Sequence, residues 1–336
     1  MKYASVFILL LFSLPSFSTV ITSEDQFSTL SLKEYRAVDQ LLSPTRMIYI
    51  KSTKTLLKTF IEKGTDLFEV HTPEFAIPEC LNSDKKIIAL ELKDKRYAVK
   101  KGNKYYRFQT EIYCNHENHL VFKYDSPEGE LIQIWDILLS AENFFLNIGR
   151  IDFWQKRINI EWPSNGDYYW RDVNITNGHH WDVVAHELGH AIYDQAQIGI
   201  FGGGMHKIDE CYSHELALSE GWASFFAAWI KVDISDPNAA FEYLVPRRAP
   251  IQIENVPKDV CLGPTNEWRV TSYLWDFIDL NAEVLNEKAE VASANIWDVF
   301  HNGKYNSIDE LSNTLSQKIV NKNLNNFVWE LNFNAK

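Results

Sequence analysis

The sequence predicts an α+β protein in which a strand-rich front section precedes a section organised around long helices. Short runs that alternate apolar and polar residues dominate from Leu67 to Tyr124, as in half-buried strands. A broad apolar face at helical spacing then runs from about Leu131 to Leu146, and further helical patterns follow it. Because Ser126 to Gly129 has turn composition, we expect a boundary there, between sections 19–128 and 129–336.

The front section is expected to contain two helices and several strands. Helices are expected over 31–42 and 53–63. Strands are expected over 86–92, 96–100, 105–113 and 119–124, with Gly102-Asn103 as a hairpin turn. The role of this section is open at this point: propeptide, substrate-binding module or part of the main fold.

The first 18 residues have the pattern of a secretory signal peptide. Lys2 precedes an apolar run from Val6 to Leu14, Pro15 breaks the run, and Ser16 to Ser18 offers small residues for cleavage. The run is too short to cross a bilayer, which takes about 20 apolar residues. We therefore expect residues 1–18 to be removed and the protein to be secreted or periplasmic, without stable membrane insertion.

The net charge and the cysteine content indicate which functions and which cross-links to expect. The net charge of -12 argues against a general nucleic-acid binder, which needs clustered Lys and Arg. Four cysteines in an exported chain are expected to form disulfide bonds. Three connectivities are open, and proximity in sequence favours Cys80–Cys114 and Cys211–Cys261. The sequence gives no indication of oligomeric state.

Two strands and a helix follow the first long helix of the back section. Strands are expected over 157–162 and 168–175, and Ser164 to Asp167 has the turn chemistry of a hairpin. A helix is expected over 181–195 directly afterwards. An edge strand in this position can hold an extended peptide through backbone hydrogen bonds.

The expected helix over 181–195 carries the sequence His186-Glu187-Leu188-Gly189-His190, which fits H-E-x-x-H. Residues four apart share one face of a helix, so both imidazoles can bind one Zn²⁺. Glu187 lies beside them, where its carboxylate can act as general base on a zinc-activated water. The alternative is a pair of ordinary surface histidines, which the apolar flanks of the motif disfavour.

A catalytic zinc site needs a third protein ligand. Ala196 occupies the place where a metzincin has its third histidine, so that class is disfavoured. Glu220 is the better candidate, because it is the only carboxylate at the head of a strongly apolar helical stretch and would be costly to bury unpaired. The alternative is an acidic residue that interacts favourably with a helix N-terminus.

These motifs together resemble those of the gluzincin metallopeptidases. H-E-x-x-H followed by Glu220-Gly221-Trp222-x-x-Phe225-Phe226 looks like the thermolysin and fungalysin branches. Asn266 to Asp276 is similar to the helix that packs behind the site in fungalysin-like proteins. The resemblance covers roughly residues 130 to 285, and implies a zincin-like metallopeptidase domain that hydrolyses a peptide or protein substrate.

By this resemblance His186, His190 and Glu220 would bind one Zn²⁺ per chain and Glu187 would be the catalytic base. Thermolysin-like enzymes place an Asp four residues after the ligand Glu to orient a zinc histidine, and this chain has Ser224 there. Another group is then expected to orient the histidine, with Asp182, Asp276 or a backbone carbonyl as candidates. Candidates for the group that stabilises the transition state are Tyr212, His214, Arg269 and Tyr273.

Three functions are compatible with these residues. The first is a secreted zinc metallopeptidase. The second is a non-catalytic zinc-binding relative that acts as a binding or inhibitory module, which the intact Glu187 disfavours. The third is a zinc hydrolase with a substrate other than a peptide. Two further histidines, His206 and His214, flank or follow Gly202 to Gly204 and are interpreted as loop residues rather than ligands.

Overall fold

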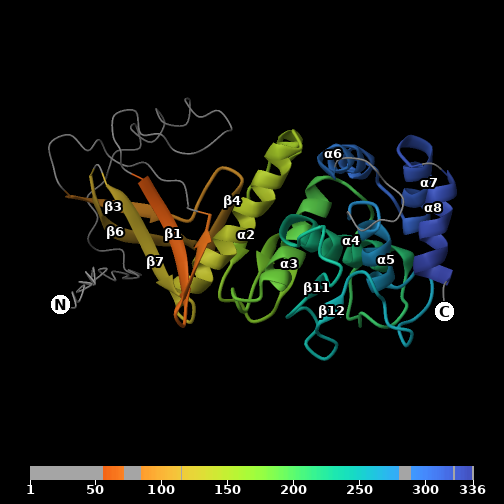
Figure 1. The fold of residues 1–336 in the computed structure, drawn as a ribbon, viewed down its shortest axis with the longest axis horizontal. Coiled ribbons are helices and arrows are strands. Elements are labelled where there is room, and N and C mark those ends of the chain that lie inside the picture. Colours follow the sequence, from red (N-terminus) through yellow and green to blue (C-terminus); the bar gives the residue numbers. More distant parts are fainter. Residues whose placement is uncertain (1–55, 72–84, 115, 280–288, 321, 335–336) are drawn as a thin grey trace, which may run out of the picture.

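The computed structural model describes residues 56–71, 85–114, 116–279, 289–320 and 322–334. The chain is a mixed α/β protein, consistent with the expected α+β class (Figure 1). The helices of the described part are α2 (Pro127–Asn147), α3 (Trp181–Gln195), α4 (His214–Lys231), α5 (Glu267–Trp275), α6 (Ala289–Phe300), α7 (Ile308–Lys318) and α8 (Lys322–Trp329), with short η1 (Ile151–Phe153) and η2 (Glu330–Asn334). The strands are β1 (Leu56–Lys63), β2 (Asp66–Val70), β3 (Lys85–Glu91), β4 (Tyr97–Lys101), β5 (Lys104–Tyr105), β6 (Arg107–Tyr113), β7 (Glu117–Lys123), β8 (Ile158–Glu161), β9 (Tyr168–Trp170), β10 (Asp172–Asn174), β11 (Ala240–Phe241) and β12 (Ile251–Gln252).

The front section forms small sheets on one side of α2, and the remaining helices lie on the other side (Figure 1). The strands β2, β1 and β7 form one sheet, and β3 pairs with β6. The helix expected over 53–63 is wrong, because residues 56–63 form β1. This strand pairs with β2 and, in parallel, with β7, so long-range pairing outweighs the local pattern. The helix expected over 31–42 lies outside the described residues.

Helix α2 begins at Pro127, earlier than the expected start near Leu131. Ser126 caps the helix, because its hydroxyl oxygen accepts a hydrogen bond of 3.0 Å from the backbone N–H of Gly129. Pro127 fits the first helical position, where its missing N–H is not needed. The residues from Ser126 to Gly129, which have turn composition, therefore form the start of a helix.

Strands from both sections build the five-stranded sheet, whose order is β5-β4-β8-β10-β9. Strand β4, from the front section, pairs in parallel with β8. The hairpin expected between 157–162 and 168–175 is wrong, because β8 and β10 are parallel. The second expected strand is instead two antiparallel strands, β9 and β10, which reverse at Arg171 with a positive φ of 63°. The division at residue 128 stays a prediction.

A buried carboxylate on α2 connects the two sections. Asp136 lies 2.6 Å from Nδ1 of His71 and accepts a hydrogen bond of 2.9 Å from Nζ of Lys231, at the end of α4. Burial alone would raise the pKa of Asp136, but these two partners outweigh burial and lower it. The carboxylate is therefore charged and holds both sections against α2.

Helix α3 packs against β9 and β10 of the five-stranded sheet, α4 packs on α3, and α5 packs on α4. The helices approach closely because glycines lie at their contacts. A Cβ at Gly189 of α3 would lie 2.9 Å from the carbonyl oxygen of Ala223 in α4. A Cβ at Gly221 of α4 would lie 2.7 Å from the carbonyl oxygen of Glu267 in α5. The three helix backbones are thus nearly in contact.

One expected disulfide bond is confirmed. Cys211 and Cys261 are bonded, with their Cα atoms 5.6 Å apart. Cys114 is also disulfide-bonded, and its expected partner Cys80 lies outside the described residues.

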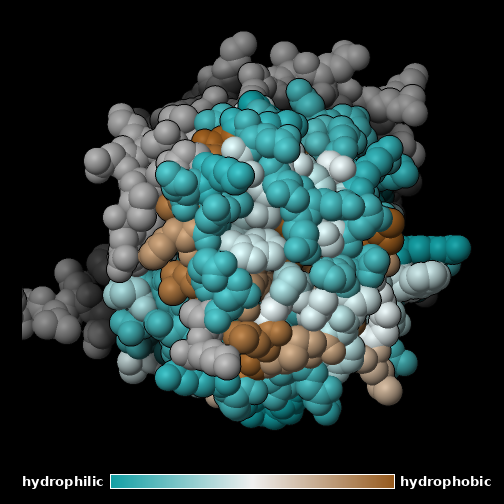
Figure 2. Space-filling view, turned by 90° about the vertical axis from the view of Figure 1, so that its right-hand side faces the viewer, coloured by the Kyte–Doolittle hydropathy of each residue, from teal (hydrophilic) through white to brown (hydrophobic). Residues whose placement is uncertain are grey.

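Within the described residues, none of the helices is both long and apolar enough to cross a membrane. The face that carries the C-terminal helices is largely hydrophilic, with separate small hydrophobic areas (Figure 2). Exposed apolar side chains such as Phe327 and Leu331 belong to α8 and η2. Scattered exposure of this kind is normal for a protein surface.

We predict that Gly189→Ala lowers the free energy of unfolding by about 1–3 kcal/mol, because the added methyl group meets backbone atoms of α4. Denaturant unfolding followed by circular dichroism measures the change. Gly203→Ala is the control, since a Cβ there has no neighbour within 4 Å. Equal stability of both variants would contradict the close contact between α3 and α4.

Candidate metal centre

Helix α3 places His186 and His190 side by side, as the motif predicts. The helix spans the expected residues 181–195 and ends where Gln197 adopts a positive φ of 51°. Both imidazoles are buried, and their Nε2 atoms lie 3.1 Å apart. The apolar neighbours of the motif explain the burial, since they place this face of α3 in the core.

Helix α4 brings Glu220 to the same point. Ser213 caps the helix by accepting a hydrogen bond from the N–H of Leu216, so α4 begins well before Glu220. The expected position of Glu220 at the head of a helix is therefore wrong, and the interaction with a helix N-terminus does not apply. Its Oε2 atom lies 3.2 Å from Nε2 of His186 and 3.0 Å from Nε2 of His190.

These three atoms have the spacing of metal ligands. Ligands that lie 2.0–2.1 Å from a tetrahedral zinc ion are about 3.3 Å apart from one another. The distances of 3.0 to 3.2 Å between the three side chains are close to this value. The buried group formed by His186, His190 and Glu220 can therefore hold a metal ion.

The charges at the centre depend on its burial. Burial alone would raise the pKa of Glu220, but His190 and His186 beside it outweigh burial and hold that pKa well below its usual range. Glu187 is different: burial raises its pKa to about 7, with a further contribution from the carboxylates of Glu220 and Asp167. One glutamate is thus a stable anion, and the other can take up and release a proton near neutral pH.

Ser224 orients one of the two histidines. Its hydroxyl oxygen lies 3.0 Å from Nδ1 of His186, one helical turn after Glu220. The expectation that Asp182 or Asp276 does this is wrong, because Asp182 accepts from the backbone of Tyr243 and Leu244. Asp276 accepts from Asn332. Nδ1 of His190 has no hydrogen-bond partner among the described residues.

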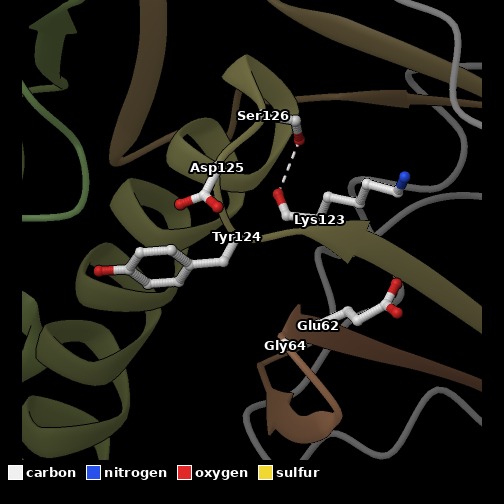
Figure 3. Close-up of a pocket in the computed structure, with 6 residues that line it drawn as sticks. All are labelled: Glu62, Gly64, Lys123, Tyr124, Asp125 and Ser126. Carbon is white, nitrogen blue, oxygen red and sulfur yellow. Dashed lines mark hydrogen bonds between the residues drawn. The ribbon is translucent and has the colours of Figure 1, made fainter.

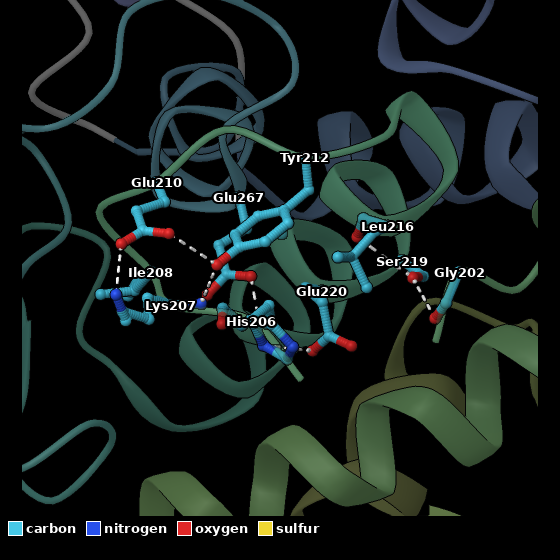
Figure 4. Close-up of polar contacts among 12 residues, drawn as sticks. Gly202, His206, Lys207, Ile208, Glu210, Tyr212, Leu216, Ser219, Glu220 and Glu267 are labelled. Atoms are coloured by element: carbon cyan, nitrogen blue, oxygen red, sulfur yellow. Dashed lines mark hydrogen bonds and ion pairs between the residues drawn. The ribbon is translucent and has the colours of Figure 1, made fainter. Parts of the chain in front are cut away.

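Two further residues of the centre were not predicted. His206, in the loop between α3 and α4, lies between Glu220 and Glu267 (Figure 4). Its Nε2 atom is 3.6 Å from Oε2 of Glu220 and 3.3 Å from Oε2 of Glu267, the first residue of α5. Burial, and then the neighbouring Glu220, raises the pKa of Glu267 well above its usual range. Glu267 lies in the segment from Asn266 to Asp276, which resembles the helix behind the site in fungalysin-like proteins, but nothing in that resemblance marks it as a possible ligand.

The four candidates for transition-state stabilisation have other contacts. His214 lies 3.3 Å from Asp309, and the buried Tyr273 donates to Asn325. Arg269 donates to the carbonyl oxygens of Cys261, Val260 and Asn332. The hydroxyl of Tyr212 donates to Glu210 and accepts from the backbone N–H of Lys207, and its ring centroid lies 6.4 Å from that of His206.

The front section has a shallow pocket of its own, between the β1–β2 turn and the start of α2 (Figure 3). It is lined by Glu62, Gly64, Lys123, Tyr124, Asp125 and Ser126. The Tyr124 ring stacks on His179, with centroids 4.3 Å apart, just before α3. The lining includes none of the metal-centre residues, so we assign this pocket no function.

The chain matches no protein-family model, and it has no significant match among curated proteins. The function is therefore inferred from the residues and their geometry alone.

We predict that Ser224→Ala weakens the binding of a metal ion, with Zn²⁺ as the probe, by about 10–100-fold, because His186 loses the partner that fixes its ring. Competition with a fluorescent chelator measures the affinity. Ser140→Ala is the control, since this buried serine on α2 donates to the carbonyl oxygen of Asp136, away from the centre. Unchanged affinity in Ser224→Ala would mean that the hydroxyl does not support the ligand.

Proposed function

We propose that this protein is a zinc-dependent metallopeptidase with a zincin-like domain, acting outside the cytoplasm. The observation that carries the proposal is the convergence of three buried ligand atoms from α3 and α4 beside Glu187. Two imidazoles and one carboxylate form the ligand set of a catalytic zinc site that keeps a fourth position open. A structural zinc site would have no need for the additional carboxylate.

The metal ion and Glu187 have separate roles in the proposed reaction. A zinc ion at the centre would supply Lewis-acid polarisation of a peptide carbonyl and make water a better nucleophile. Glu187 accepts the proton of the attacking water and delivers it to the leaving amine. Burial raises its pKa, which favours uptake of the proton from water, and a base that also acts as an acid works best near the ambient pH.

A peptide substrate is supported by the sheet next to α3. Strand β9 is the last strand of the five-stranded sheet, so its outer edge can accept an extended peptide. The strand is held against α3, because Tyr169 donates a hydrogen bond of 2.8 Å to Asp194 of that helix. Trp170 and Tyr168, 73% and 45% exposed, offer aromatic surface to the side chains of a peptide.

Export is supported by the signal-peptide pattern of residues 1–18, which lie outside the described part, and by the Cys211–Cys261 disulfide bond. Disulfide bonds persist mainly in oxidising compartments. Together they support a secreted or periplasmic location.

We expect Glu187→Gln to lower peptide cleavage by about 10²–10⁴-fold while zinc content stays unchanged, because only the proton-transfer group is lost. A mixed peptide library analysed by mass spectrometry measures cleavage and shows which side chains are preferred. Glu215→Gln, in the first turn of α4, is the matched control. A chelator should abolish cleavage, and added zinc should restore it.

Two results would contradict the proposal. One equivalent of zinc without Glu187-dependent cleavage would instead indicate a binding or inhibitory module, or a hydrolase with another substrate. No bound zinc in the wild type would remove the basis of the proposal altogether.

A further inference from the structure

A second group of potential ligands adjoins the first and shares Glu220 with it. His206, Glu220 and Glu267 each offer one ligand atom, and the three atoms lie within 4.8 Å of one another. The residues come from the α3–α4 loop, from α4 and from α5, and their polar ends converge in Figure 4. The proposed zinc site uses only Glu220 of these three.

The hydrogen bonding of His206 directs its Nε2 atom into this group. Its Nδ1 atom lies 3.0 Å from the carbonyl oxygen of Gly204, and because a carbonyl can only accept, Nδ1 carries the proton. In the neutral ring Nε2 is then a lone pair, directed towards the carboxylates of Glu220 and Glu267. Metal-binding histidines commonly have this arrangement, with the other ring N–H donated to a carbonyl.

The carboxylate of Glu267 provides an independent indication. Its side chain is 9% exposed, and Oε2 accepts no hydrogen bond from the described residues. A buried carboxylate oxygen that accepts no hydrogen bond is costly unless it is paired with a cation or binds a metal ion. Nε2 of His206 lies 3.3 Å from this oxygen.

The group is held in place from several sides. Asn266 caps α5 and donates hydrogen bonds of 2.8 Å to the carbonyl oxygens of Ile208 and Glu210, which fastens the loop of His206 to the helix of Glu267. The Cys211–Cys261 bond ties the same loop to the segment before α5. Hydrogen bonds and a disulfide bond within the protein therefore position the segments that carry the three ligand atoms.

We propose that His206, Glu220 and Glu267 bind a second divalent metal ion, with Glu220 shared between the two sites. A set of one imidazole and two carboxylates suits Zn²⁺ or Mn²⁺. Two metal ions a few ångströms apart occur in aminopeptidases, where they clamp the reacting oxygens together. The inference rests on the proposed zinc site, because Glu220 belongs to both.

Metal content tests this inference without reference to activity. Equilibrium dialysis against Zn²⁺, and separately against Mn²⁺, is followed by elemental analysis of the folded protein. We expect wild type to take up two equivalents of at least one of these ions, and Glu267→Gln and His206→Asn to take up one. The controls His214→Asn and Glu111→Gln, which change exposed side chains elsewhere, should retain two.

Three outcomes would overturn the second site. Wild type that saturates at one equivalent of each ion would show that His206, Glu220 and Glu267 bind no second metal ion. Two equivalents retained in both variants would place the second ion elsewhere. Loss of the second ion in His214→Asn as well would indicate surface binding by histidine.

The two proposals fail in different ways. One zinc equivalent with Glu187-dependent cleavage would leave the peptidase proposal intact and remove only the second site. Two equivalents of metal ion without peptide cleavage would leave the second site intact and remove the peptidase proposal. If Glu267→Gln does not fold, as judged by circular dichroism, His206→Asn carries the test, because its side chain is 27% exposed in a loop.

Discussion

The near contact of α3 with α4 at Gly189 is the constraint on which the metal centre depends. The two histidines and Glu220 come from different helices, and their ligand atoms meet only because no side chain separates the two backbones at this point. Gly221 does the same between α4 and α5, which brings Glu267 near. Backbone proximity thus decides which carboxylates can reach the histidines.

Neighbouring imidazoles give one of three buried glutamates a different pKa from the other two. Glu187, Glu220 and Glu267 are all buried, but only Glu220 has two imidazoles in contact with a carboxylate oxygen. Its pKa is lowered, whereas the pKa values of the other two are raised. A pair of carboxylates whose surroundings separate their pKa values is a common arrangement in hydrolytic sites.

The sequence predicts local features of this protein better than long-range ones. Helix α3 and its two histidines follow from a periodic pattern within one segment, and the bounds agree with the structure. The predicted helix at β1 and the predicted hairpin pairing of β8 were wrong, because strands far away in the sequence decide both. Ser224 and His206 show the same limit within the site, since their importance depends on which helix or loop packs beside them.

The position of β4 has a consequence for any shortened form of the protein. This strand comes from the front section, but it lies between β5 and β8 in the sheet that supports α3. A fragment that begins at Gly129 would lack it and would leave β8 with an unpaired edge. Open edges of this kind pair with other chains. Proteolytic release of the front section would therefore favour aggregation of the remainder.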